Sequence, residues 1–286
     1  MAGQNQRFHL KVEKAEGPEG TALLDYPVER VQAKATLSDG RTIDIPGRHA
    51  IVRTDIPQTL GVVSDSYKWI THKEMKIAVD KALFELGLDF KSKVKLVSGG
   101  ERCYIDYILP NVAGDINPEL GDLVQFRARA HNSVDGRVRL GMSVGGERLV
   151  CSNGMTAYES LFNVSKKHTA TLDLQEIVQS LKDNVSRFTD YLVPFWRGLA
   201  EKSITDLKGI DVIDENSGKT LPKKYDEHIR HRWLHPVREE DSGRNLWSLY
   251  NAYTDASTHK LAERALERGQ DAEAKIHGMF LELAKA

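Results

Sequence analysis

Residues 93–151 read KVKLVSGGERCYIDYILPNVAGDINPELGDLVQFRARAHNSVDGRVRLGMSVGGERLVC. Apolar and polar residues alternate through much of this stretch, and a period of two is typical of an antiparallel sheet with one face on a core. The apolar set contains Val94, Leu96, Cys103, Ile105, Tyr107, Val124, Phe126, Ala128, Ala130, Val138, Leu140, Met142 and Leu149. The other set contains Lys93, Lys95, Arg102, Tyr104, Arg127, Arg129, Arg137, Arg139 and Arg148. We therefore expect a sheet of short strands with a basic outer face.

Glycine pairs are expected to set the register of these strands. Gly99-Gly100 and Gly145-Gly146 each predict a two-residue turn, and residues 134–136 (VDG) predict a three-residue hairpin loop with Gly136 in the left-handed conformation. A register that keeps the apolar residues together places four arginines on the outer face. Like charges opposite each other on a sheet cost a few tenths of a kcal/mol per pair, on the order of 0.5 kcal/mol, so this grouping needs an explanation.

Helices are expected before and after the sheet in the chain. Residues 71–86 predict an amphipathic helix with Thr71 as N-cap, Glu74 at the capping-box spacing and Gly87 as the stop. A long amphipathic helix is expected from Asp173, with a kink or restart at Pro194.

The ends of the chain give weaker signals. Residues 7–15 and 31–45 predict strands, the second with a hairpin turn at 38–40 (SDG), and 203–206 (SITD) is a second candidate capping box. Residues 208–245 are expected to be irregular. A final helix is predicted from Leu246 to Arg268, interrupted at Gly269 and followed by a short helical tail.

These elements predict an α+β fold, in which an antiparallel β-meander is flanked by helices. We expect a strand-rich N-terminal element (1–60), an α+β core (61–207), and a charged loop with C-terminal helices (208–286).

Composition limits the classes of function. The 286 residues include 40 basic and 41 acidic ones, which argues against a protein that coats nucleic acid with its whole surface but allows a local basic groove. We expect no signal peptide and no membrane-spanning segment. Cys103 and Cys151 fall on apolar strand faces, so buried reduced thiols in a cytoplasmic protein are expected.

Four segments carry a family resemblance: HNSVDG (131–136), ERLVCSNGM (147–155), His168-Thr169 and LWSLYNAYTDASTH (246–259). In order and spacing they resemble the phage- and plasmid-associated family called domain of unknown function 932, over about residues 61–259. Gly154 departs from the threonine common in that family, and 208–245 has no counterpart. The family has no established activity, so the resemblance implies a DNA-related role in a bacterial host but no catalytic residue.

The expected order of elements is also similar in architecture to Rad52-type single-strand annealing proteins. That resemblance implies a ring or filament of copies that holds single-stranded DNA in a basic groove. It is an analogy of fold without a shared motif.

Two basic regions are the candidate nucleic-acid contacts. Cations would neutralise phosphates and aromatic rings would stack on bases. The alternative for the sheet is a solvated face whose arginines pair with acids such as Asp106; for 219–238 it is a loop packed by Tyr225 and Trp233. The candidate residues are Lys93, Lys95, Arg102, Tyr104, Arg127, Arg129, Arg137, Arg139, Arg148, Lys223, Lys224, Arg230 and Arg232.

Two further sets of residues are candidates for a functional site. His228, His231 and His235 suggest a metal site, but no Cys or carboxylate partner has ligand spacing, so no metal or other cofactor is expected. The polar residues of the family-like segments either form buried hydrogen bonds or line a ligand site: Asn132, Asp135, Asn153, His168, Asn251, Thr254 and His259.

The sequence therefore predicts a non-enzymatic protein that binds and anneals single-stranded DNA in recombination or replication, as a homo-oligomer. The alternatives are an accessory factor that binds a host protein in antidefence or host takeover, and an enzyme that uses the Asn, His and Asp residues.

Overall fold

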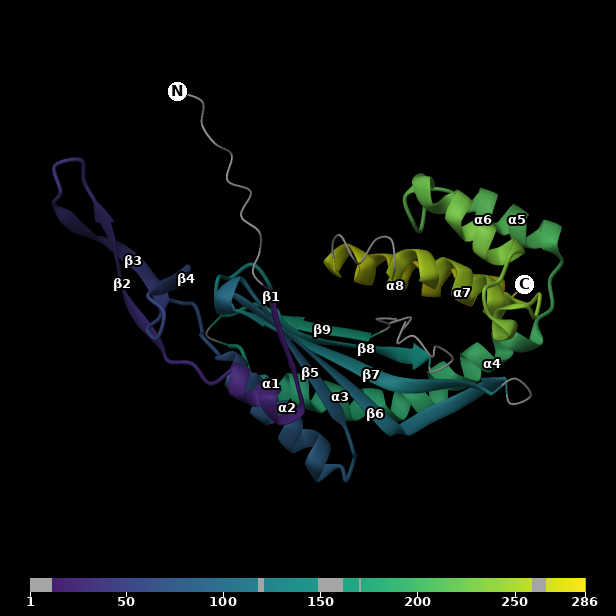
Figure 1. Cartoon of the computed structure of the whole chain (residues 1–286), viewed down its shortest axis with the longest axis horizontal. Helices are drawn as coiled ribbons and strands as arrows, with labels where there is room; N and C mark the ends of the chain where they lie inside the picture. The colour runs from purple at the N-terminus through teal and green to yellow at the C-terminus, as the bar shows by residue number, and fades with distance from the viewer. Residues whose placement is uncertain (1–11, 118–120, 149–161, 170, 259–265, 286) are drawn as a thin grey trace. The chain divides into compact units, whose positions relative to one another are not determined.

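The structure, a computed structural model, describes residues 12–117, 121–148, 162–169, 171–258 and 266–285 (Figure 1). It is α+β, as predicted. The strands are β1 (Val12–Glu16), β2 (Val28–Thr36), β3 (Thr42–Arg53), β4 (Gln58–Ser64), β5 (Lys91–Val97), β6 (Arg102–Asn117), β7 (Asp122–Ser133), β8 (Leu140–Arg148) and β9 (Phe162–Lys166). The helices are α1 (Gly17–Leu23), α2 (His72–Glu85), α3 (Leu174–Arg187), α4 (Val193–Glu201), α5 (Asp206–Glu215), α6 (Asp226–Leu234), α7 (Leu246–Ala256) and α8 (Leu266–Leu283).

The six-stranded sheet has the order β1-β5-β6-β7-β8-β9. From β5 onward this is chain order, so the predicted meander is confirmed. Alternation along β5 and β6 is also confirmed, since Val94, Leu96, Cys103 and Ile105 are at most 1% exposed. Burial raises the pKa of the Cys103 thiol, and Cys151 lies outside the described residues.

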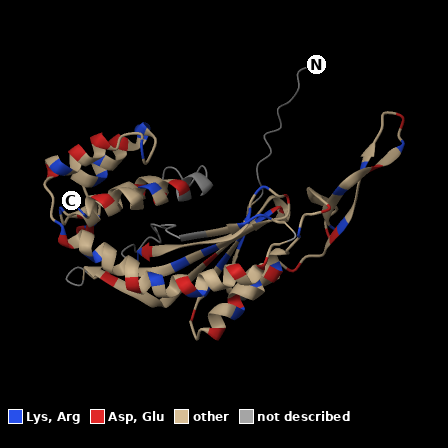
Figure 2. Cartoon of the chain, turned by 180° about the vertical axis from the view of Figure 1, so that it is seen from behind, with Lys and Arg blue, Asp and Glu red and all other residues tan. Residues whose placement is uncertain are grey.

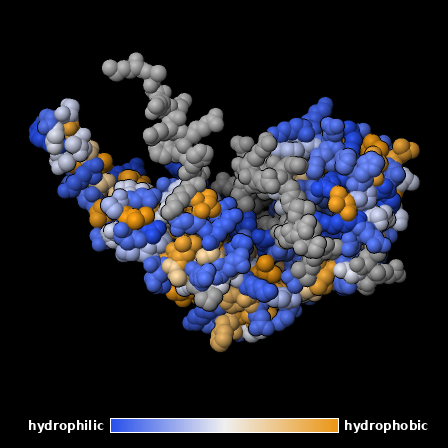
Figure 3. Space-filling model, viewed as in Figure 1, coloured by the Kyte–Doolittle hydropathy of each residue, from blue (hydrophilic) through white to orange (hydrophobic). Residues whose placement is uncertain are grey.

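The second sheet has the order β2-β3-β4. The predicted turn at 38–40 joins β2 to β3, with Gly40 at φ +85°. The paired β2 and β3 continue past the end of β4 as a two-stranded ribbon (Figure 1). Orange side chains lie over this sheet in Figure 3, and Val31, Ile43 and Val62 are 39%, 51% and 52% exposed.

Two of the predicted turns need correction. Gly145-Gly146 is no turn, because β8 runs through it to Arg148. A Cβ on Gly146 would lie 2.5 Å from Val124 Cγ1 and 2.7 Å from the ring of Trp196, so packing excludes a side chain there. The β7–β8 connection is longer than three residues, although Gly136 has the expected positive φ of +74°. A turn does form at Gly99-Gly100, but it is longer than the predicted two residues, since a 3₁₀ turn (Ser98–Gly100) lies between the end of β5 at Val97 and the start of β6 at Arg102.

Helix α2 forms as predicted. The Thr71 side chain accepts a hydrogen bond from the Glu74 N–H, and the Glu74 carboxylate accepts one from the Thr71 N–H. Met75, Val79 and Leu83 are fully buried along one face of the helix.

The helical region after the sheet differs in detail from the prediction. Helix α3 passes through a π-helical turn (Phe188–Leu192) into α4, with Pro194 in the first turn of α4. Thr205, not Ser203, caps α5, and α5 and α6 occupy much of the region predicted to be irregular. Helix α7 ends at Ala256, and α8 continues through Gly269, where an interruption was expected.

Contacts divide the chain into two compact units. The first comprises Met1–Tyr107, Arg129–Met142 and Val164–Ser180, and the second comprises Ile108–Ala128, Ser143–Asn163 and Leu181–Ala286. Strands β6, β7 and β8 contribute residues to both, and each unit is described separately below. Within the described residues, none of the helices combines the length and the apolar character required to cross a bilayer.

Candidate nucleic-acid interface

The outer face of the sheet in the first unit gathers cations from three strands. In the β1–β5 register, Lys14 lies opposite Lys95 and Glu16 lies opposite Lys93. Arg102 and Tyr104 alternate with the buried Cys103 and Ile105 on β6, and so lie on the face opposite the core. Figure 2 shows Lys and Arg residues along neighbouring strands of this sheet. We call Lys14, Lys95 and Arg102 the cation cluster.

The cation cluster has no carboxylate partner among the described residues, unlike its neighbours. Lys93 is 2.6 Å from Glu16, and Arg129 donates two hydrogen bonds of 2.5 and 2.9 Å to Asp106. By contrast, the buried Nε of Arg102 has no hydrogen-bond acceptor in the described structure.

The pKa of Lys95 reflects the positive electrostatic potential of this face. Its pKa lies below the ordinary lysine value, first because the side chain is half-buried, and then because Arg129 and Lys14 repel the charged ammonium. Asp106 offsets part of this repulsion. A negatively charged ligand would relieve the remainder.

Two predicted contact residues are buried instead. Arg148 has 4% exposure and hydrogen bonds to Asp122 and Asp241, and Arg127 has 9% exposure and lies 3.5 Å from Glu147. Because β8 is continuous, Arg148 has the parity of Leu140 and Met142 and so lies on the face opposite Glu147. The prediction that Arg148 lies on the outer face is therefore wrong, because it depended on a turn at Gly145-Gly146.

Arg137 and Arg139 lie in the connection after β7 and are exposed. Arg137 is 3.6 Å from Asp135 and its side chain is 73% exposed. These two cations are accessible but are not part of the cation cluster on the strands.

The second basic region forms part of the second unit. Lys223 and Lys224 are exposed on a 3₁₀ turn (Lys223–Tyr225), whereas Arg230 pairs with Asp214 and Arg232 with Asp255. The aromatic residues of this segment are core residues. Tyr225 is 7% and Trp233 is 1% exposed, and Trp233 Nε1 donates to the Asp206 carbonyl, so neither ring is presented to a ligand.

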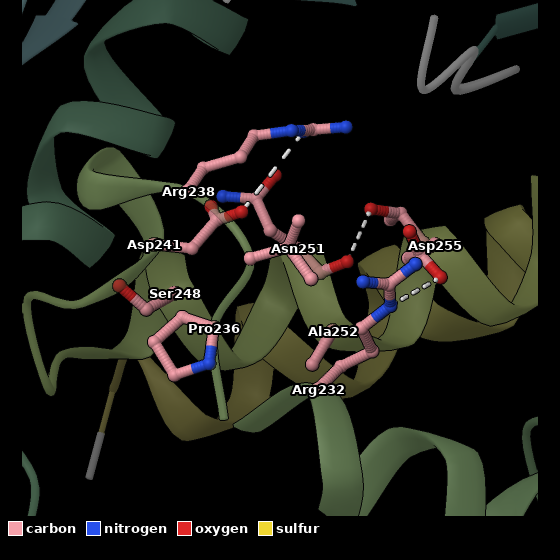
Figure 4. A pocket seen from close by; sticks show the side chains of 10 residues that line it. Arg232, Pro236, Arg238, Asp241, Ser248, Asn251, Ala252 and Asp255 are labelled. Atoms are coloured by element: carbon pink, nitrogen blue, oxygen red, sulfur yellow. Dashed lines mark hydrogen bonds and ion pairs between the residues drawn. The ribbon is translucent and has the colours of Figure 1, made fainter. Parts of the chain in front are cut away.

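A pocket in the second unit joins this segment to α7 (Figure 4). Arg232 and Arg238 line one part of it and Ser248, Asn251 and Thr254 line another. Its volume of about 30 Å³ holds roughly two water molecules, since one water needs at least about 10–15 Å³. Asn251 Nδ2 donates to the Trp247 carbonyl and Thr254 Oγ1 to the Asn251 carbonyl, so both side chains bond within their own helix.

The histidines of the second basic region are not gathered in one cluster. His228 Nε2 is 2.7 Å from Asp255, while His231 and His235 lie with ring centroids 5.2 Å apart. Within the described part of the chain, no three His, Cys, Asp or Glu side chains are grouped as metal ligands.

Polar residues of the family-like segments form a buried network in the first unit. Asn132 is fully buried and its Nδ2 donates to the Ile70 carbonyl and to His72 Nδ1, while the other ring nitrogen of His72 lies 2.9 Å from the Gly100 carbonyl. Burial lowers the pKa of His72 to about 4. His168 stacks on Tyr67 at 4.7 Å, and burial lowers its pKa. Asn153 and His259 lie outside the described residues.

A family model described as a domain of unknown function (DUF932) matches residues 59–277. The chain belongs to the DUF932 family. No curated protein and no solved structure matches it.

The DUF932 match includes residues 208–245, a region in which no family-like segment was expected. In the structure, two of the family-like segments are connected through one aspartate. Arg148 comes from one and Trp247 from another, and Asp122 on β7 accepts hydrogen bonds from both, with Trp247 Nε1 at 2.7 Å. Asp122 had no motif to single it out in the sequence. Lys14 was missed because the pairing of β1 with β5 is not visible in either segment alone.

Proposed function

We propose that this DUF932 protein binds single-stranded DNA on the outer face of the six-stranded sheet. The observation that carries the proposal is the juxtaposition of Lys14 and Lys95 on paired strands, where neither lysine forms an ion pair with a carboxylate among the described residues and Asp106 offsets only part of the repulsion at Lys95. Like charges directly opposite each other destabilise a sheet. A polyanion supplies the missing negative charge, and each phosphate contact releases a counterion.

Tyr104 supports a single strand over a duplex. It lies two residues from Arg102 on β6, on the same face and partly exposed. A tyrosine ring beside cations can stack on an unpaired base, and such stacking accepts any base sequence. In a duplex the bases are stacked on one another and offer no free ring face at this position.

The proposed cellular role is strand annealing during recombination or replication in the cytoplasm of a bacterial host, in keeping with a phage or plasmid origin. Bases held only through their phosphates remain accessible for pairing. Assembly of copies into a Rad52-like ring or filament would lengthen the bound strand, and the exposed apolar residues Val31, Ile43 and Val62 of the small sheet support such contacts.

The test is the salt dependence of binding to a fluorescent 30-nucleotide single strand. In the triple variant Lys14→Gln, Lys95→Gln, Arg102→Gln, the slope of log K against log[salt] should fall by about 2, since each lost contact removes about 0.7 for single strands. The matched control is Lys34→Gln, Arg41→Gln, Lys81→Gln, which removes the same charge from side chains that are 61%, 76% and 73% exposed elsewhere in the first unit. An unchanged slope in the first variant, or equal losses in both, would overturn the proposed interface.

A further inference from the structure

A groove of about 470 Å³ opens in the first unit on the helix-covered side of the six-stranded sheet, at the end of the edge strand β1. Its walls come from the junction of β1 and α1 (Glu16, Thr21), from α2 (Lys76, Asp80) and from the start of β5 (Phe90, Ser92). A site of this volume is within the usual range for small ligands, roughly 300–1,000 Å³. It exceeds the pocket at α7 by more than tenfold.

The groove contains an ion pair between a buried lysine and a partly exposed aspartate, and the pair has hydrogen-bonding capacity left over. Lys76 is 3% exposed, and its ammonium donates to Asp80 Oδ2 at 2.6 Å, which is its one hydrogen bond with the described residues. An ammonium has three N–H donors, so two remain. Asp80 is 31% exposed, and its Oδ1 accepts from the Tyr107 hydroxyl at 2.9 Å.

The groove therefore presents a donor and an acceptor side by side. Each carboxylate oxygen of Asp80 can accept a second hydrogen bond, and Lys76 supplies N–H donors next to it. The ion pair has no net charge, so it does not favour the binding of an isolated anion. It fits a ligand edge on which an acceptor and a donor are adjacent.

An aromatic wall completes the site. Phe90 is partly exposed and packs edge-on against Tyr107, with ring centroids 5.7 Å apart. At the rim Lys91 is exposed, and Glu16 links the groove to the basic face through its ion pair with Lys93. A flat ring would pack on Phe90, and a phosphate attached to it would reach Lys91.

We propose that this groove binds one nucleobase of the strand held on the basic face. The Watson–Crick edge of every base carries an acceptor next to a donor, which the Lys76–Asp80 pair can bind, while Phe90 contacts the ring and Lys91 the phosphate. The inference deepens the proposed function and rests on it for the identity of the ligand.

The test is titration of the whole protein with the four deoxynucleoside monophosphates, followed by NMR chemical shifts. Binding should be saturable, and Lys76→Met should weaken it about tenfold, since the variant lacks the charged hydrogen-bond donor. Lys81→Met on the same helix is the matched control, because Lys81 is 73% exposed and does not line the groove. If Lys76→Met fails to fold, Phe90→Ala, at a partly exposed position, should give the same loss.

Two outcomes separate this inference from the proposed function. The cation-cluster variant should lose oligonucleotide binding and keep mononucleotide binding, whereas Lys76→Met should lose mononucleotide binding and keep most oligonucleotide binding. Mononucleotides that cause no saturable shift, or that bind equally to wild type, Lys76→Met and Phe90→Ala, would overturn the groove assignment even if oligonucleotides bind. If the wild-type protein binds mononucleotides but not oligonucleotides, only the interface is overturned.

Discussion

Arg148 on β8 donates hydrogen bonds from Nε and Nη2 to the two carboxylate oxygens of Asp122 on β7. Both side chains are buried, and the third guanidinium nitrogen donates to Asp241. The pKa of Arg148 is raised above its ordinary value: burial opposes the charge, but the two carboxylates more than offset that effect. Together with Trp247, this makes the arginine the centre of a network that joins the strands of the second unit to α7.

We expect Arg148→Met to destabilise the protein by about 3–5 kcal/mol, because it leaves the carboxylate of Asp122 buried without its cation. Urea unfolding measures the change. Replacing both partners, Arg148→Met with Asp122→Leu, should cost less than the single change, since the carboxylate at position 122 is removed as well, although Trp247 Nε1 loses its acceptor. Lys93→Met, which breaks an exposed ion pair, should cost under about 1 kcal/mol; a similar loss at Arg148 would show that its network contributes little.

Gly146→Ala should lower the stability by about 1–3 kcal/mol, because the new methyl group would overlap Val124 and Trp196. Thermal unfolding of the variant and the wild type measures this loss of stability. Gly198→Ala is the matched control: no atom lies within 4 Å of its Cβ position in α4, and alanine favours a helix over glycine by up to about 1 kcal/mol. Equal effects at both glycines would contradict the packing at β8.

Stability should fall as the pH is lowered from 6.5 toward 4, in part because of His72. Burial holds its folded pKa at about 4, so the unfolded chain takes up the proton first as the pH drops below the ordinary value of 6.5. The contribution is therefore complete above pH 6.5, and its loss amounts to about 2 kcal/mol at pH 5.

The measurement is the free energy of unfolding at pH 7 and pH 5. His72→Gln should reduce the difference between the two values even if the variant is less stable overall. The same change at the exposed His235 is the control. A pH dependence that survives His72→Gln unaltered would assign the effect to other groups, such as the half-buried His131, whose pKa is also lowered by burial.

Tyr104→Leu should weaken binding to a single strand by about 1–3 kcal/mol, the contribution of one aromatic–base stack. Binding to a duplex of the same sequence should change less. Fluorescence anisotropy with both ligands gives the comparison, and Tyr191→Leu, at a position 42% exposed in the second unit, is the control. Equal losses for the two ligands would argue against stacking on an unpaired base.

Local signals in the sequence predicted much of the fold. Helix α2 begins after the N-cap Thr71 as expected, because Thr71 and Glu74 have the three-residue spacing of a capping box. Buried and partly exposed residues alternate along the sheet as expected, because side chains on a strand have a period of two. The errors arose because a pair of glycines occurs both in turns and at positions within a strand where a neighbour packs too closely for a side chain. Gly145-Gly146 has the composition of a turn, but the reason for Gly146 is Trp196, fifty residues later in the chain.

The candidate site was less predictable because it depends on pairings between distant residues. The positive residues of the outer face were visible, yet which of them are neutralised is decided by partners such as Asp106 for Arg129 and Asp122 for Arg148. Lys14 joins the cation cluster because β1 pairs with β5, some eighty residues away. The Lys76–Asp80 pair has ordinary helical spacing, and its burial under a groove cannot be seen from that spacing.

The position of Lys14 also links ligand binding to the protection of backbone amides. Strand β1 is a five-residue strand at the edge of its sheet, with one strand neighbour, and short edge segments open more readily than central strands. A polyanion that bridges Lys14 and Lys95 would hold β1 against β5. Deuterium uptake at residues 12–16 should therefore slow when DNA is added, which would make this short edge strand a reporter of the bound ligand.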